Sequence, residues 1–241
     1  MGLPYFQFKR FGIEQRTVAQ RVGTDGVLLG AWASVVHRPK RILDIGTGTG
    51  LIALFVAQRT EQFQVKKIVG VDIHQPSIRC AVCNFQASPW AAHLSAEHVA
   101  IQNYYPKEFE QFDLIVSNPP FFTAGVPAPN DERRVGRMAE YLNPEALVKA
   151  VRRLISYSGV FCTILPPIEG QRLCELAACH GLYCTRFAAV FSRPGKPVER
   201  LLLQFETAPF AFERSEITIY DAPGHYSDAF KAITHAFYVQ H

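Results

Sequence analysis

The sequence predicts an α/β fold in which helices cover both faces of a mostly parallel sheet. From Arg41 onward, short apolar runs alternate with segments of helical periodicity, and strands without polar alternation belong to sheets that are buried on both faces. A glycine-rich turn separates the first of these strands from the first helix, as in folds that bind a nucleotide-like cofactor. Late in the chain, two strands follow each other without room for a helix, which predicts one antiparallel strand.

Each expected element has a local signal. Apolar runs bounded by turn residues predict strands at 41–45, 67–72, 98–102, 112–117, 159–165, 183–191, 200–206 and 216–220. Helical spacing predicts helices at 51–59, 75–87, 144–155, 169–179 and 227–238. Pro76 and Pro144 suit a first helical turn, and Asn143 is an expected N-cap. We expect seven of these eight strands to form a Rossmann-like sheet with one antiparallel late strand.

Composition indicates a globular protein, because 48% hydrophobic and 19% charged residues are enough for a large core. No linker or repeat divides residues 1–241, which we expect to form a single domain. The net charge of +4 permits an anionic partner without requiring one. No apolar run approaches membrane-spanning length and no signal peptide is visible, so we expect a soluble, cytoplasmic protein. We expect a monomer, although an oligomer is also compatible with the sequence.

No metal site is expected. Cys80 and Cys83 form a C-x-x-C pair inside a predicted helix, but the remaining cysteines supply no second pair at zinc-site spacing.

The stretch LDIGTGTG places Gly46, Gly48 and Gly50 between a strand and a helix. Glycines let the backbone pass close beneath a ligand, and a helix N-terminus offers N–H groups to an anion. A dinucleotide fingerprint needs a further glycine at position 51, where this chain has Leu51. With Asp44 leading it, the pattern D-I-G-T-G-T-G instead resembles motif I of S-adenosylmethionine-dependent methyltransferases.

Two further residues are candidates for cofactor contacts. Asp72 ends the strand 67–72, where a carboxylate accepts hydrogen bonds from ribose hydroxyls. After the third strand, folds of this kind often have an acid that binds the adenine amine. The segment 100–103 has no acid here, so we expect the side-chain carbonyl of Gln102 or Asn103 to replace it.

The sequence VSNPPFF, 116–122, ends the strand 112–117 with a stiff corner. An aromatic exocyclic amine is a weak nucleophile because its lone pair is delocalised into the ring. Carbonyl oxygens that accept both amine protons favour a pyramidal nitrogen, and Asn118 and Pro119 offer two such oxygens. Pro120 stiffens the turn, and Phe121 offers a face on which a flipped base can stack. The corner therefore predicts catalysis on an exocyclic amine.

Three other stretches carry a closer resemblance: FQFKRFGIEQRTVAQRVGTDGVLLGAWA, NFQASPW and HYSDAFKAITHAFY. Together with the motifs above, they resemble the tRNA1(Val) adenosine-37 N6-methyltransferase family (TrmN6/YfiC-like) of class I methyltransferases. The resemblance implies methyl transfer from S-adenosylmethionine to N6 of adenosine 37 in a tRNA. It also implies that residues 1–40 form an extension completing the cofactor and substrate site, with Thr24, Asp25 and Gly26 closing over the methionine end of the cofactor.

Basic residues are candidates for contacts with RNA phosphates. Lys9 and Arg10 lie in the N-terminal segment, and Arg133, Arg134 and Arg137 lie in the long stretch after the diproline corner. Acidic residues nearby largely neutralise that stretch, so a solvated charged segment is an equal alternative for it.

Several alternatives remain open from the sequence. Phe121 stands where N6-adenine enzymes more often have tyrosine, and phenylalanine is also common in rRNA guanine-N2 methyltransferases. A protein glutamine N5-methyltransferase also suits the corner, although such enzymes usually carry a larger N-terminal domain. A non-catalytic module would conflict with the intact Asn118 and glycines, and an NAD oxidoreductase would conflict with Leu51.

Overall fold

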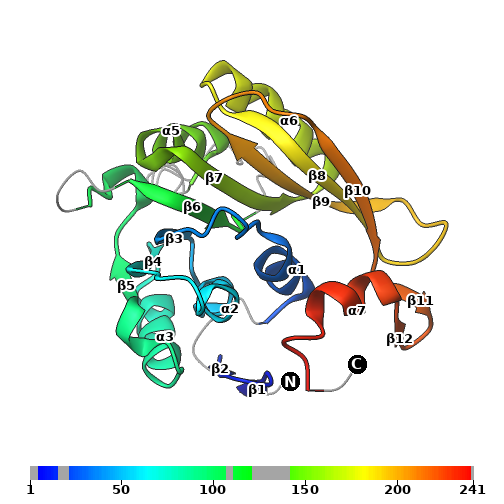
Figure 1. Cartoon of the computed structure of the whole chain (residues 1–241), viewed down its shortest axis with the longest axis horizontal. Coiled ribbons are helices and arrows are strands. Elements are labelled where there is room, and N and C mark those ends of the chain that lie inside the picture. The colour runs from blue at the N-terminus through cyan, green and yellow to red at the C-terminus, as the bar shows by residue number, and fades with distance from the viewer. Residues whose placement is uncertain (1–4, 16–21, 107–110, 121–141, 240–241) are drawn as a thin grey trace, which may run out of the picture.

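A computed structural model of the chain describes residues 5–15, 22–106, 111–120 and 142–239. A central sheet carries helices on both faces, which confirms the predicted α/β class (Figure 1). In the described residues no helix is long and apolar enough to cross a bilayer. The same residues hold no group of three or more His, Cys, Asp or Glu side chains that could bind a metal ion.

The central sheet has eight strands in the order β10-β8-β9-β7-β6-β3-β4-β5. Only β9 is reversed, because it runs antiparallel to β7 and β8 while the other neighbours pair in parallel. The strands are β3 (Arg41–Ile45), β4 (Lys67–Asp72), β5 (Leu94–His98), β6 (Phe112–Ser117), β7 (Ile155–Leu165), β8 (Tyr183–Phe191), β9 (Val198–Glu206) and β10 (Glu213–Thr218).

Two details of the predicted sheet are wrong. The sheet has eight strands rather than seven, because β10 extends it by pairing along β8. The third strand is Leu94–His98 rather than 98–102, and residues Ile101–Asn103 form a 3-10 helix, η2. Since β5 is an edge strand whose residues are half-buried or exposed, its apolar signal is weak.

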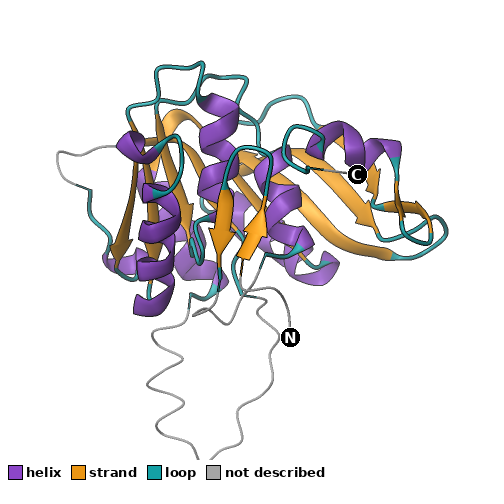
Figure 2. Ribbon diagram, turned by 90° about the horizontal axis from the view of Figure 1, so that it is seen from below, coloured by secondary structure: helices purple, strands orange, loops and turns teal. Residues whose placement is uncertain are grey.

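The helices divide between the two faces of the sheet (Figure 2). Side chains alternate along each strand, so Ile42 and Leu114 face one layer while Leu43 and Ile115 face the other. The first layer holds α1 (Thr24–Trp32), α2 (Leu51–Thr60), α3 (Gln75–Gln86) and α7 (Asp228–Thr234), and the second holds α5 (Pro144–Leu154) and α6 (Pro167–Cys179). The predicted N-cap is confirmed, because the Asn143 side chain accepts a hydrogen bond from the amide of Ala146 at 2.7 Å.

The segment before the first sheet strand packs against the end of the chain. It contains the hairpin β1 (Tyr5–Gln7) and β2 (Gly12–Glu14) as well as α1. The amide of Lys9 donates to the carbonyl of Phe237 at 2.7 Å, and the rings of Phe8 and Tyr238 lie with centroids 5.7 Å apart. The remaining elements are η1 (Ala91–His93), β11 (Tyr220–Ala222) and β12 (His225–Tyr226).

Candidate functional site

A cavity of about 490 Å³ opens at the carboxyl ends of the parallel strands. This edge of an open α/β sheet is where ligands bind, because the loops there leave a crevice between helices. The lining comes from three parts of the chain that the sequence singled out and from the ends of three late strands. It comprises Gly23, Thr24, Asp25, Gly26, Leu28, Gly46, Thr47, Gly48, Thr49, Leu51, Ile52, Asn118, Val190, Ser192, Glu199, Arg200, Ile219 and Tyr220.

The glycine turn uses the backbone freedom of its three glycines. Gly46, Gly48 and Gly50 have φ of 72°, 55° and 82°, a region that side-chain-bearing residues rarely adopt. A Cβ on Gly46 would meet nothing within 4 Å, whereas a Cβ on Gly50 would lie 2.4 Å from the Phe85 ring. Gly46 therefore leaves open space for a ligand at the cavity, while Gly50 allows α2 and α3 to pack closely.

Asp44 stabilises this turn from the buried side, away from the cavity. It is fully buried, and its Oδ2 accepts hydrogen bonds from Thr47 Oγ1 at 2.8 Å and from the amide of Ala53 at 3.3 Å. Burial raises the pKa of Asp44 from 3.8 to about 7, and the two hydrogen bonds offset only part of that rise. Asp44 thus holds the turn against the start of α2 and does not border the cavity.

Asp72 also shapes the turn. Its Oδ2 accepts the amide of Gly48 at 3.0 Å, and its Oδ1 accepts the amide of His74 at 2.8 Å. Each carboxylate oxygen keeps a further lone pair, so ribose hydroxyls remain possible partners. Gln102 lies in η2, beyond the end of β5. Neither residue belongs to the cavity lining, and the expected ribose and adenine contacts stay predictions.

Asn118 borders the cavity directly after β6. Ser117 pairs with Ile45 in the β3–β6 ladder, and its hydroxyl donates to the carbonyl of Ile45 at 2.9 Å. Since Ile45 immediately precedes Gly46, this contact ties the start of the corner to the start of the glycine turn. Pro119 is buried and Pro120 is exposed. Phe121 lies outside the described residues.

The first turn of α1 faces the cavity, with Thr24, Asp25 and Gly26 all in its lining, and their expected contact with the methionine end of the cofactor stays a prediction. Gly23 is the N-cap and makes no side-chain capping bond. Asp25 forms an ion pair with Arg200 on β9, in which Nε lies 2.8 Å from Oδ2. Sequence analysis missed Arg200, because nothing local links residues so far apart in the chain.

Comparisons with known proteins agree with this geometry. The family model described as "Methyltransferase small domain" matches residues 27–144. A tRNA1(Val) (adenine(37)-N6)-methyltransferase from Vibrio parahaemolyticus is 39% identical over 98% of this chain and 95% of its own. A protein of the same name from Parabacteroides distasonis is 37% identical over 100% of both chains.

The chain belongs to the tRNA1(Val) (adenine(37)-N6)-methyltransferase family.

Solved structures that resemble this chain have the same fold. A protein from Agrobacterium tumefaciens described as a predicted O-methyltransferase has a TM-score of 0.66 at 16% identity, covering 88% of this chain and 96% of that one. The T. thermophilus 16S rRNA N2 G1207 methyltransferase, solved with AdoMet and guanosine, has a TM-score of 0.57 at 19% identity, covering 86% and 52%. At these identities the likeness shows the class I methyltransferase fold alone.

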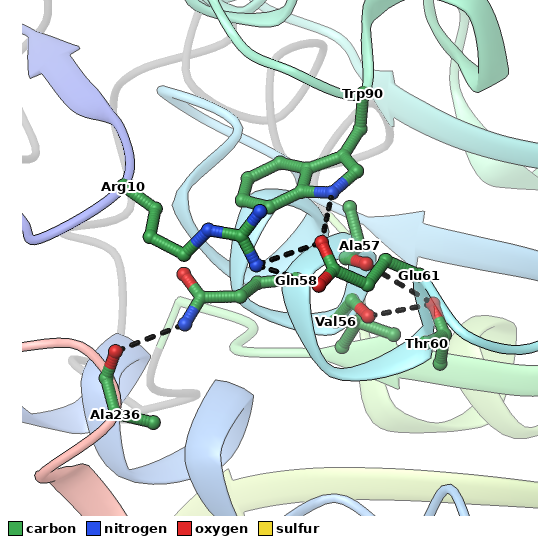
Figure 3. Close-up of polar contacts among 8 residues, drawn as sticks. All are labelled: Arg10, Val56, Ala57, Gln58, Thr60, Glu61, Trp90 and Ala236. Atoms are coloured by element: carbon green, nitrogen blue, oxygen red, sulfur yellow. Dashed lines mark hydrogen bonds and ion pairs between the residues drawn. The ribbon is translucent and has the colours of Figure 1, made fainter.

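Lys9 and Arg10, the predicted phosphate contacts, have partners within the chain. Arg10 Nη1 lies 2.7 Å from both carboxylate oxygens of Glu61 on α2, and its guanidinium lies 5.3 Å from the centroid of the Trp90 ring (Figure 3). Lys9 Nζ donates to the carbonyl of His235 at 2.6 Å. Both side chains therefore fasten the N-terminal segment, and an RNA contact by either stays a prediction. Arg133, Arg134 and Arg137 lie outside the described residues.

Asn84 is a second residue that sequence analysis missed. It is buried on α3, exchanges hydrogen bonds with the backbone of Glu14, and donates to the carbonyl of Thr49 at 2.9 Å. It thereby joins the N-terminal hairpin to the glycine turn in this methyltransferase. Its signal in the sequence was the stretch NFQASPW, which begins with Asn84 and contributes to the family resemblance.

Proposed function

We propose that this protein transfers a methyl group from S-adenosylmethionine to N6 of adenosine 37 in a tRNA. Family membership over nearly the whole chain supports the reaction and the substrate class. The observation that carries the proposal is that Asn118 borders the same cavity as Gly46 and Gly48. The amine-binding corner and the cofactor turn therefore meet in one space.

The residues present fit S-adenosylmethionine, which supplies an electrophilic methyl group on a sulfonium when bound. The missing side chain of Gly46 leaves open space beside the turn. The N-terminus of α1 lacks a side-chain cap and suits the methionine carboxylate through its free amides. In this proposal Asp72 accepts the ribose hydroxyls and Gln102 the adenine amine, while Asp44 and Gly50 hold the turn in shape.

Asn118 and Pro119 act on the target amine. The side-chain oxygen of Asn118 and the carbonyl of Pro119 accept the two N6 protons, which directs the nitrogen lone pair at the methyl group. Because the Ser117 contact to Ile45 fixes the start of the corner, these acceptors are held in place before the base arrives. The methylated amine is strongly acidic and loses its proton without a tuned general base. Phe121 supplies the stacking face in this proposal.

The N-terminal residues complete the site, and 1–241 act as one domain. Segment 23–28 contributes to the cavity, and the Arg200–Asp25 ion pair holds the first turn of α1 over it. A cytoplasmic monomer that meets its tRNA after transcription is part of the same proposal.

The alternative target, guanine N2, has less support. The rRNA guanine-N2 enzyme is related by fold alone, at 19% identity over 52% of its own chain. Nucleoside analysis distinguishes the two targets directly.

The test is mass spectrometry of tRNA nucleosides after incubation with the purified protein and S-adenosylmethionine. N6-methyladenosine at position 37 is expected. Asn118→Leu keeps the side-chain volume but removes the acceptor, and we expect it to lower kcat by about 100-fold or more while leaving cofactor affinity within a few-fold. Asn118→Asp keeps an acceptor and should retain measurable activity. N2-methylguanosine as the product, or label in protein or rRNA with none in tRNA, would contradict the proposal.

A further inference from the structure

A column of aromatic rings runs from the core to the cavity. Phe230 is fully buried and stacks on Tyr226 with centroids 4.6 Å apart and planes 22° apart. Tyr226 stacks in turn on Tyr220, at 5.0 Å and 17°. Tyr220 is half-buried and belongs to the cavity lining. The last ring of this stacked column therefore lines the cavity.

A rigid basic turn lies beside this ring. The connection between β8 and β9 reads Ser-Arg-Pro-Gly-Lys-Pro, 192–197, and carries two cations and no carboxylate. The amide of Lys196 donates to the carbonyl of Arg193 at 3.2 Å, and Gly195 takes a φ of 74°. Arg193 and Lys196 are exposed, and within the described part of the chain neither forms an ion pair. Their charges are therefore free to meet a ligand.

The ring and the basic turn form one continuous surface. The amide of Tyr220 donates to the carbonyl of Ser192 at 3.0 Å, and the amide of Ile219 donates to Phe191 at 2.9 Å. Ser192 itself belongs to the cavity lining. Figure 1 shows the β8–β9 connection projecting from the sheet beside β11 and β12. We call this surface, Tyr220 with residues 192–197, the lip of the site.

An aromatic face next to exposed cations is the arrangement that binds single-stranded nucleic acid, since bases stack on the ring and phosphates meet the charges. Asn118 lies in the same cavity as Tyr220, so a nucleotide held at Asn118 has its chain neighbours near the lip. The folded backbone prearranges the lip, because the column, the turn hydrogen bond and two prolines limit its motion.

We propose that the lip binds the anticodon-loop nucleotides that flank the target adenosine, with Tyr220 stacking on a base and Arg193 and Lys196 contacting phosphates. This inference rests on the proposed function and assigns that function an RNA-binding surface made from described residues. It also differs from the basic segments that the sequence singled out.

The proposed phosphate contacts of Arg193 and Lys196 are tested by the salt dependence of tRNA binding to the full-length protein. Binding is measured by fluorescence anisotropy with S-adenosylhomocysteine present. Each lost phosphate contact lowers the slope of log K against log salt by about 0.7 to 0.9, so Arg193→Gln/Lys196→Gln should lower it by about 1.5. Lys66→Gln/Lys67→Gln removes the same charge at the opposite edge of the sheet and should leave the slope unchanged. A wild-type slope for the Arg193/Lys196 variant overturns the proposal.

The ring is tested with Tyr220→Phe, which keeps stacking, and Tyr220→Leu, which keeps most of the volume. We expect Tyr220→Leu to weaken tRNA binding about tenfold relative to Tyr220→Phe, with matching S-adenosylmethionine affinity showing that both variants keep the folded site. Tyr157→Leu, at a tyrosine that is 90% exposed near the start of β7, is the control and should bind tRNA normally. Equal tRNA affinity of the two Tyr220 variants overturns the proposal. A wild-type protein that forms no N6-methyladenosine contradicts the proposed function instead.

Discussion

Replacing Asp44 with asparagine should stabilise the folded protein in a pH-dependent way. Asp44 is fully buried, and its Oδ1 has no hydrogen-bond partner among the described residues. Burial raises its pKa from 3.8 to about 7. The folded chain therefore holds this proton more tightly than the unfolded chain, so stability falls as pH rises from about 4 to about 7. A pKa difference of about 3 corresponds to a loss of about 4 kcal/mol above that range.

The side-chain amide of the Asp44→Asn variant carries no such charge but keeps an oxygen for Thr47 and Ala53. The stability of the variant relative to wild type should therefore increase by about 3 kcal/mol between about pH 5 and about pH 8. Urea unfolding of both proteins without cofactor, followed by tryptophan fluorescence, measures this difference.

Glu216→Gln provides the matched control. Glu216 is exposed on β10, so its replacement should leave the pH dependence of stability unchanged. A difference between Asp44→Asn and wild type that stays constant, or that shrinks as pH rises, would refute the reasoning, because a buried carboxyl with a raised pKa requires the opposite trend.

Three further predictions concern the turn and the N-terminal segment. Gly46→Ala and Gly195→Ala both place a side chain at positive φ in open space, so each should lower the free energy of unfolding in urea by about 1 kcal/mol. Only Gly46→Ala should also weaken S-adenosylmethionine binding, at least about tenfold by titration calorimetry. Asn84→Ala leaves buried backbone groups unpaired and should cost about 2 to 3 kcal/mol; a change below about 0.5 kcal/mol would show that the contact to the glycine turn is unimportant. A double-mutant cycle of Arg10→Ala and Glu61→Gln should give a coupling free energy of about 1 kcal/mol between the two side chains, since they are 43% and 32% exposed. A coupling of zero would leave Arg10 free for RNA.

Local signals predicted the glycine turn and most of the sheet. The positive φ of Gly46, Gly48 and Gly50 is a requirement of the turn itself, so the residue type marks it. Strands such as Phe112–Ser117 are buried on both faces, so their sequence is a continuous apolar run that identifies them without knowledge of the tertiary structure. Edge strands lack that run, which is why Leu94–His98 was misplaced and the addition of β10 to the sheet was not counted.

Assigning roles to charged residues needed the tertiary structure. Arg10 was predicted as a phosphate contact, but its guanidinium meets Glu61, which comes from a different element. Asp44 and Asp72 were assigned to the cofactor from motif position. The structure shows that both also hold the turn in shape, through Thr47 and Gly48 respectively.

The amino-acid sequence alone determined the reaction class, because a glycine turn and a diproline corner are each built from neighbouring residues whose backbone geometry is local. Tertiary structure alone decided that Arg200 pairs with Asp25, and that Tyr220 ends an aromatic column and donates its amide to Ser192 in the β8–β9 connection. These contacts join segments up to 175 residues apart. No local preference encodes them, since they form only when the packed sheet brings its carboxyl edge, α1 and α7 together.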